Sequence, residues 1–209
     1  MTHILQIVSS VKGPLSKSTV LSGELVARLR DQHDSARVTV RDVAAQPIAP
    51  LDAAALGALS TPADRRSPEQ QALVDDHDAL IAEIQSADIV VFAIPMYNFA
   101  VPVQLKAYFD AIARSGVTFR YGATGVEGLL QGKKVHVVFT RGGLHRGTIS
   151  DSQTAFVQTF LAFVGLTDVE YVYAEGLDMG PDAQATGLEA ARRVIAAHFE
   201  ERAPLRSVA

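Results

Sequence analysis

The sequence of 209 residues predicts an α/β fold, in which helices cover both faces of a parallel sheet. Three continuous apolar runs, His3 to Val8, Ile89 to Ile94 and Val135 to Phe139, are rich in β-branched residues and lack alternation, as in strands buried on both faces. Helical patterns separate these runs, and strands that alternate with helices form parallel sheets. Because 48% of the residues are hydrophobic, one large core is possible, and we expect a single domain over residues 1–209.

The same patterns define the other elements of the fold. Two more strands are expected at Arg37 to Val43 and Val169 to Tyr173. The expected helices are Thr19 to Asp31, Gln70 to Ser86, Val101 to Arg114, Thr154 to Val164 and Asp182 to Glu201. Right-handed crossovers leave few topologies for five strands, and we expect a doubly wound sheet with the flavodoxin-like order 2-1-3-4-5.

One connection is longer than an αβ loop needs to be. The stretch Ala44 to Ser67 is rich in proline and contains a helical-looking segment, Leu51 to Leu59. Connections of this length in compact domains are often functional lids.

The composition excludes several classes of function. There is no cysteine, which rules out disulfides, thiolate metal sites and cysteine nucleophiles, so any redox chemistry requires a bound cofactor. The net charge of -4 is mild and the basic residues are scattered, so nucleic acid is not an expected partner. No apolar run approaches the roughly 20 residues that span a bilayer, and the N-terminus lacks a signal core. We therefore expect a cytoplasmic protein with no membrane contact.

The loop after the first strand has the composition of a phosphate site. Ser9 to Thr19 is rich in hydroxyls, contains Gly13 and opens a helix, where unpaired N–H groups and dipole charge collect. A Walker loop is excluded, because Val11 and Ser16 stand where it needs glycine. In the alternative interpretation, Ser18 only caps the helix.

Two further strand ends predict a site for a planar ligand. Ile94 to Phe99 ends the third strand in a polar, aromatic loop, which Pro95 forces out of helical geometry. Thr140 to Gly143 ends the fourth strand, and its two glycines allow close approach to a flat ring. Parallel strands direct both loops, and the phosphate loop, to one edge of the sheet. Alternatively, the glycines form an ordinary turn, and Tyr97 and Phe99 are packing residues.

Together, these motifs resemble those of the bacterial FMN-dependent NADH-azoreductases, which are also NADH:quinone oxidoreductases and are related to the animal quinone reductases. The resemblance extends over most of the chain. It is carried by Ser10, Ser16 to Ser18, Pro95 to Phe99, Pro102, Leu105 to Ala107, Asp110, Gly116 to Tyr121, Gly132 to Lys134, Thr140 to Gly143, Thr159 to Leu161, Gly165 to Asp168 and Ala174 to Leu177.

The resemblance implies a flavodoxin-like homodimer that binds one FMN per subunit at the dimer interface and uses NADH as electron donor. The residues it assigns to the FMN phosphate are Ser10, Ser16, Lys17 and Ser18, and those it assigns to the isoalloxazine are Met96, Tyr97, Asn98, Phe99, Thr140, Arg141, Gly142 and Gly143. Thr140 stands where the family commonly has serine, and Lys17 occupies a variable position. Both residues keep the hydrogen-bonding or phosphate-compatible character that FMN binding needs.

Four residues are candidates for the substrate pocket. His145 matches a family histidine and is the one catalytic candidate, because it could stabilise charge at the flavin pyrimidine. Alternatively, it only orders its loop. Phe119, Tyr121 and Phe163 resemble the family's pocket aromatics, with Tyr121 reaching over the partner's flavin, although the helical spacing of Phe163 also fits core packing. The other histidines show no pattern of metal ligands, and no metal is predicted.

The implied activity is the reduction of quinones and azo compounds with electrons from NADH, including reductive cleavage of the azo bond to amines. We expect NADH and the acceptor to use the same site in turn, in a ping-pong mechanism. The alternatives are a flavodoxin-type electron carrier, which would bind FMN but dock on proteins, and a nucleotide-binding regulator without redox activity.

Overall fold

The computed structural model of the chain describes residues 1–33, 35–123 and 125–200. Its centre is a five-stranded parallel sheet in the order β2-β1-β3-β6-β7. The strands are β1 (His3–Val8), β2 (Arg37–Asp42), β3 (Ile89–Pro95), β6 (Lys134–Thr140) and β7 (Asp168–Ala174). All five overlap the predicted strands, and counted among themselves they occupy the positions of the expected order 2-1-3-4-5. Their labels differ because an additional strand pair precedes β6.

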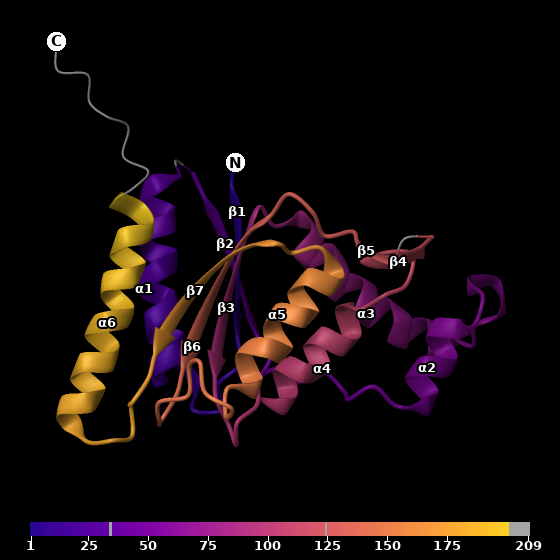
Figure 1. The fold of residues 1–209 in the computed structure, drawn as a ribbon. Coiled ribbons are helices and arrows are strands. Elements are labelled where there is room, and N and C mark those ends of the chain that lie inside the picture. The colour runs from indigo at the N-terminus through magenta and orange to yellow at the C-terminus, as the bar shows by residue number, and fades with distance from the viewer. Residues whose placement is uncertain (34, 124, 201–209) are drawn as a thin grey trace, which may run out of the picture.

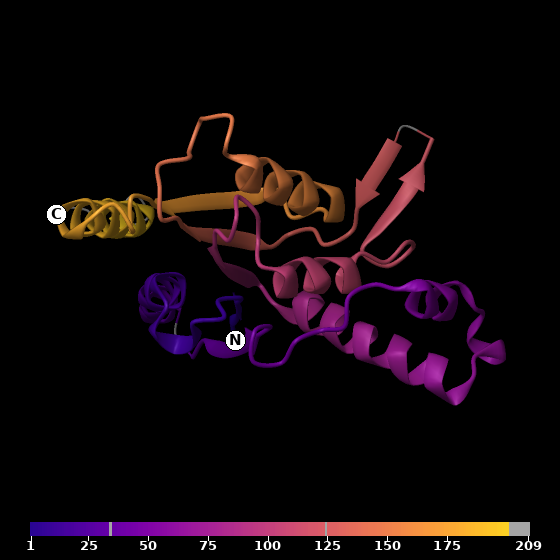
Figure 2. The same ribbon diagram turned by 90° about the horizontal axis from the view of Figure 1, so that it is seen from below.

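Helices lie on both sides of this sheet (Figures 1 and 2). α1 (Lys17–Gln32) and α6 (Pro181–Glu200) pack on one face, and α3 (Pro68–Ser86), α4 (Val103–Ile112) and α5 (Ser152–Val164) pack on the other. Each face has its own hydrophobic core, because successive strand residues point to opposite faces. In β3, for example, Val91 belongs to the core under α1 and α6, whereas Phe92 belongs to the core under α3 to α5.

Local capping explains where the helices differ from prediction. α1 begins two residues earlier than expected because the Ser16 side chain accepts a hydrogen bond from the Thr19 amide. α4 begins later than expected, because Pro102 is extended at its N-cap. The predicted last residue of α6, Glu201, lies outside the described residues.

A hairpin that the sequence did not predict stands between α4 and β6. Its strands, β4 (Phe119–Gly122) and β5 (Gly125–Gly128), are antiparallel and form a separate sheet. Gly128 lies against Gly165 at the end of α5, so closely that a Cβ on Gly128 would lie 2.0 Å from the Gly165 nitrogen. Because only glycine allows this approach, the contact fixes the base of the hairpin on α5.

The long connection 44–67 contains α2 (Ala53–Ser60) and the short 3-10 helix η2 (Ala63–Arg65). α2 packs on α3 and extends outward, away from the central sheet (Figure 2). Among the described residues, no helix combines the length and the apolarity needed to cross a membrane.

Candidate functional site

A cleft with about 440 Å³ of open space lies at the carboxyl edge of the sheet, where the loops after β1, β3, β6 and β7 meet. The cleft is lined by Ser10, Lys12, Ser16, Lys17, Ser18, Pro95, Met96, Tyr97, Thr140, Arg141, Gly142, Leu177 and Asp178. Nine of the twelve residues expected to bind the cofactor are in this lining, and Asn98, Phe99 and Gly143 are their immediate neighbours.

The loop after β1 surrounds the N-terminus of α1 with hydroxyl groups. It turns through η1 (Gly13–Leu15), where Gly13 has a φ of 69° that favours glycine. Ser16, and not Ser18, is the N-cap of α1, which corrects the alternative interpretation of Ser18 as the cap. Ser18 is fully buried, and its hydroxyl lies 3.4 Å from that of Ser16. No acidic residue occupies the first turn of α1, so the helix dipole is free to attract an anion.

The loop after β3 approaches the phosphate loop through Tyr97, whose hydroxyl lies 3.0 Å from the Ser10 hydroxyl. Tyr97 and Ala100 exchange backbone hydrogen bonds of 3.0 Å, which closes a tight turn over Asn98 and Phe99. Both turn residues have positive φ, 49° for Asn98 and 67° for Phe99. Asparagine tolerates this conformation, but a bulky residue seldom adopts it, which makes Phe99 a point of backbone strain.

The loops after β6 and β7 are joined by backbone hydrogen bonds. The amides of Gly176, Leu177 and Asp178 donate to the carbonyls of residues 143, 141 and 142, respectively. Asp178 lies so close to Gly142 that a Cβ on residue 142 would be 2.4 Å from Asp178 Oδ2. Sequence reasoning did not identify Asp178 as a site residue. The available signal was its position just beyond the end of the last parallel strand.

Arg141 has a fully buried side chain that makes several polar contacts. Its guanidinium donates to Asp151 at 2.8 Å, to Glu175 at 3.0 Å and to Gln153 at 3.1 Å. It also lies over the ring of Tyr173, with 5.2 Å between its central carbon and the ring centroid. A buried guanidinium is tolerated because its donors are paired in this way.

The Arg141 contacts connect several loops of the site. Gln153 donates to the carbonyl of Pro95 in the loop after β3, and Glu175 accepts from the amide of His145. Asp151 caps α5. Burial acts to raise the pKa of Asp151, but the hydrogen bond from Arg141 and the contacts with Thr154 outweigh it, so this pKa is below its ordinary value. The Arg141 side chain therefore supports the loops that line the cleft.

His145 lies beside the loops expected to flank the ring. Its ring makes an edge-on contact with Phe99, and a Cβ on Gly143 would lie 2.9 Å from its Nε2. Nδ1 lies 2.8 Å from the Ser150 hydroxyl. The residue therefore orders its own loop and also places Nε2 next to Gly143.

The three aromatic candidates for the substrate pocket form a separate group. Phe119 packs against Phe163 with tilted rings and 4.3 Å between ring centroids, and it meets Tyr121 edge-on at 5.7 Å. Phe163 packs against the core, and Tyr121 is 74% exposed on the hairpin. Within one chain, the structure does not bring these residues to the cleft lining.

Taken together, the cleft offers a hydroxyl-rich helix N-terminus at one end and two close loops at the other. The first fits a phosphate group and the second fits the edge of a flat ring. With the strand order described above, these features define a protein of the flavodoxin-like class.

The comparisons with known proteins agree. The model of a family described as having a flavodoxin-like fold matches residues 2–199. The FMN-dependent NADH:quinone oxidoreductase 6 of Burkholderia lata is 55% identical over 197 residues, which cover 94% of this chain and 100% of the relative. A protein of Leptothrix cholodnii, also named FMN-dependent NADH:quinone oxidoreductase, is 56% identical over 198 residues, which cover 93% and 95%. The chain therefore belongs to the family of the FMN-dependent NADH:quinone oxidoreductases.

Solved structures give the same fold. An azoreductase from Bacillus anthracis str. Sterne superposes with a TM-score of 0.83 at 25% identity, covering 94% of this chain and 100% of that one. An FMN-dependent NADH-azoreductase from Bacillus anthracis str. Ames Ancestor, solved in complex with FMN, has a TM-score of 0.83 at 19% identity and covers 94% and 99%.

Proposed function

We propose that this protein is an FMN-dependent oxidoreductase that takes a hydride from NADH and reduces quinones, and that it also cleaves azo compounds reductively to amines. The observation that carries the proposal is the cleft itself, in which the loops after β1, β3 and β6 combine a phosphate site with a ring site. The names of the similar proteins support the same activity.

The residues of the cleft fit FMN. The hydroxyls of Ser10, Ser16 and Ser18 and the N-terminus of α1 would hold the phosphate, with Lys17 and Lys12 adding positive charge. The segments 96–99 and 140–143 would flank the isoalloxazine. When bound, FMN supplies the capacity to accept a hydride and to pass electrons on.

The protein's own contribution is to bind and orient. The close loops 141–143 and 176–178 fix the edge of the ring site, and the turn at Asn98 and Phe99 fixes its mouth. We propose that His145, with Nδ1 held by Ser150, keeps Nε2 beside Gly143 to stabilise negative charge there. We also propose that NADH and the acceptor use one site in turn, in a ping-pong mechanism.

We further propose a homodimer with its FMN sites at the interface. The support is a set of large apolar side chains that are more than half exposed: Phe99, Leu144 and Met179 on the loops beside the cleft, and Val103 at the start of α4. Exposed apolar surface of this kind marks interaction sites. In the dimer, Tyr121 and its neighbours Phe119 and Phe163 would complete the partner's substrate pocket. The expected cytoplasmic location stays a prediction.

The test uses the visible spectrum of the purified protein. We expect a flavin spectrum that bleaches when NADH is added without oxygen and recovers when benzoquinone or an azo dye is added. Initial rates measured at several NADH and quinone concentrations should give parallel double-reciprocal lines. A colourless protein that fails to take up FMN would contradict the proposal, and intersecting lines would contradict the shared site.

The alternative of an electron carrier receives less support. Such a carrier would bind FMN and dock on proteins, but it would not oxidise NADH directly. The family relatives are named as NADH:quinone oxidoreductases, and the net charge of -4 is mild for a protein that docks through charge. An NADH oxidation assay with quinone as the only acceptor distinguishes the two functions.

A further inference from the structure

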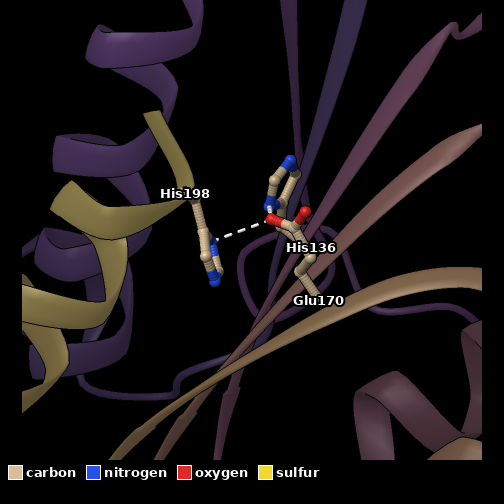
Figure 3. A group of neighbouring side chains, drawn as sticks. All are labelled: His136, Glu170 and His198. Atoms are coloured by element: carbon tan, nitrogen blue, oxygen red, sulfur yellow. Dashed lines mark ion pairs between the residues drawn. The ribbon is translucent and has the colours of Figure 1, made fainter. Parts of the chain in front are cut away.

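A second cluster of polar side chains lies near the opposite edge of the sheet from the cleft. His136 of β6 and Glu170 of β7 are partners in the strand register, near the beginnings of their strands. His198 reaches them from the last turns of α6 (Figure 3). We propose that these three residues bind a divalent transition metal ion, with zinc as the best fit.

The distances suit a single ion. Glu170 Oε2 lies 3.3 Å from His136 Nδ1 and 2.9 Å from His198 Nδ1, and all the candidate ligand atoms lie within 4.8 Å of one another. In a tetrahedral zinc site with bonds of about 2.0 Å, neighbouring ligand atoms are about 3.3 Å apart. Small movements of the side chains would therefore place the three atoms around one ion.

The donor types also fit. Two imidazole nitrogens and one carboxylate oxygen form a common protein ligand set for zinc, and they leave a fourth position for water. The His136 side chain is 2% exposed, whereas those of His198 and Glu170 are 17% and 25% exposed. A bound ion would therefore be anchored on the buried strand and reached by solvent from the side of α6.

Lys134 prepares the carboxylate for this role. Its ammonium lies 2.7 Å from Glu170 Oε1, which leaves Oε2 for the histidines. Such outer contacts orient metal ligands.

Sequence reasoning predicted no metal site because the histidines show no ligand spacing. The cluster forms only through tertiary structure, when β6 and β7 pair and α6 packs across them. The ion would fasten the end of α6 to the sheet, far from the cleft, so we place it outside the site proposed for FMN.

The test measures zinc binding to the tag-free, FMN-loaded protein by titration calorimetry and by metal analysis after dialysis. We expect one zinc ion per chain. His198→Gln should weaken binding by at least about tenfold, because it removes one of three ligands. Zinc should raise the thermal unfolding midpoint of the unchanged protein but not that of His198→Gln. The matched control is His33→Gln, a histidine outside the cluster, which should bind zinc as the unchanged protein does.

A second measurement needs no variant. Cobalt, bound in place of zinc, should show the intense visible absorption of a tetrahedral ion at wavelengths longer than those of FMN. The proposal is overturned if the unchanged protein binds no zinc, if His198→Gln folds and binds zinc equally well, or if bound cobalt has the weak spectrum of an octahedral ion. Each of these outcomes would mean that the three side chains do not form a tetrahedral metal site.

Discussion

At the scale of single residues, the side chain that matters most for the shape of the site is Arg141. The resemblance assigned it to cofactor binding, and it does line the cleft. Its guanidinium, however, is engaged by Asp151, Glu175 and Gln153. Sequence alone did not reveal this support, because the partners lie in two segments that are separate in the sequence, the start of α5 and the loop after β7.

Asn98 is expected to matter through its backbone conformation. Asn98 has a φ of 49°, a left-handed conformation that costs most residues with a Cβ about 1–2 kcal/mol and that asparagine tolerates better than alanine, whereas glycine adopts it freely. We expect Asn98→Ala to bind FMN several-fold more weakly and Asn98→Gly to bind it nearly as the unchanged protein does. Fluorescence titration of the apoprotein with FMN measures both. Equal weakening in the two variants would instead indicate a role for the asparagine side chain.

Asp151 predicts how stability depends on pH. Because its pKa in the folded state is below that in the unfolded state, its ionised form stabilises the fold above the unfolded pKa of about 3.9, and this contribution is lost as the pH falls through the folded value. Asp151→Asn should therefore lower the free energy of unfolding by about 1–3 kcal/mol at neutral pH, and by less in acid. Urea denaturation across this pH range measures the difference.

The control for Asp151 is Glu24→Gln. Glu24 pairs with Arg192 of α6 on the surface, where the free energy of an ion pair is small. If Glu24→Gln destabilises the protein as much as Asp151→Asn does, burial of the Arg141 contacts is not the cause.

At the scale of elements, the sequence was sufficient for the central sheet and its helices. The buried strands are continuous apolar runs, and such runs can be recognised without knowing which strands they pair with. The hairpin β4–β5 gave no such signal, because most of its residues are exposed and three of them are glycines at or near its ends. Its position depends on the contact between Gly128 and Gly165, which no local pattern encodes.

The N-terminus of α1 allows a test of the proposed phosphate site. Ser16→Ala removes both a helix cap, which costs about 1 kcal/mol, and a hydroxyl of the proposed phosphate site. We expect a loss of affinity for FMN with little change for riboflavin, which lacks the phosphate. Parallel titrations with the two flavins measure this.

Ser67→Ala is the matched control for Ser16→Ala. Ser67 caps α3 in the same way but lies in the long connection, outside the cleft. Its loss should lower stability by a similar amount and leave both flavin affinities unchanged. An equal loss of FMN affinity in the two variants would mean that stability, and not phosphate contact, controls binding.

At the scale of the whole molecule, the proposed dimer explains why large apolar side chains are exposed on the surface of one chain. Val103 is 65% exposed on α4 and lines a largely apolar groove together with Val101 and Phe156. The aromatic group of Phe119, Tyr121 and Phe163 lies apart from the cleft of its own chain. In a dimer, this group could lie beside the cleft of the partner.

Val103→Glu tests this assembly. A charge in an apolar interface is costly to bury, so we expect the variant to become monomeric and to lose quinone reductase activity. Val194→Glu, on the other side of the sheet in α6, is the control and should remain dimeric. Sedimentation analysis measures both. If Val103→Glu stays dimeric, α4 is not part of the interface.

The contacts among Arg141, Gln153 and Glu175 have a thermodynamic consequence for cofactor binding. Because they are made within the chain, the loops hold their shape before any flavin arrives. Little conformational entropy is then lost on binding, which is the advantage of preorganisation. The apoprotein should therefore bind FMN at low concentration without first having to rearrange its loops.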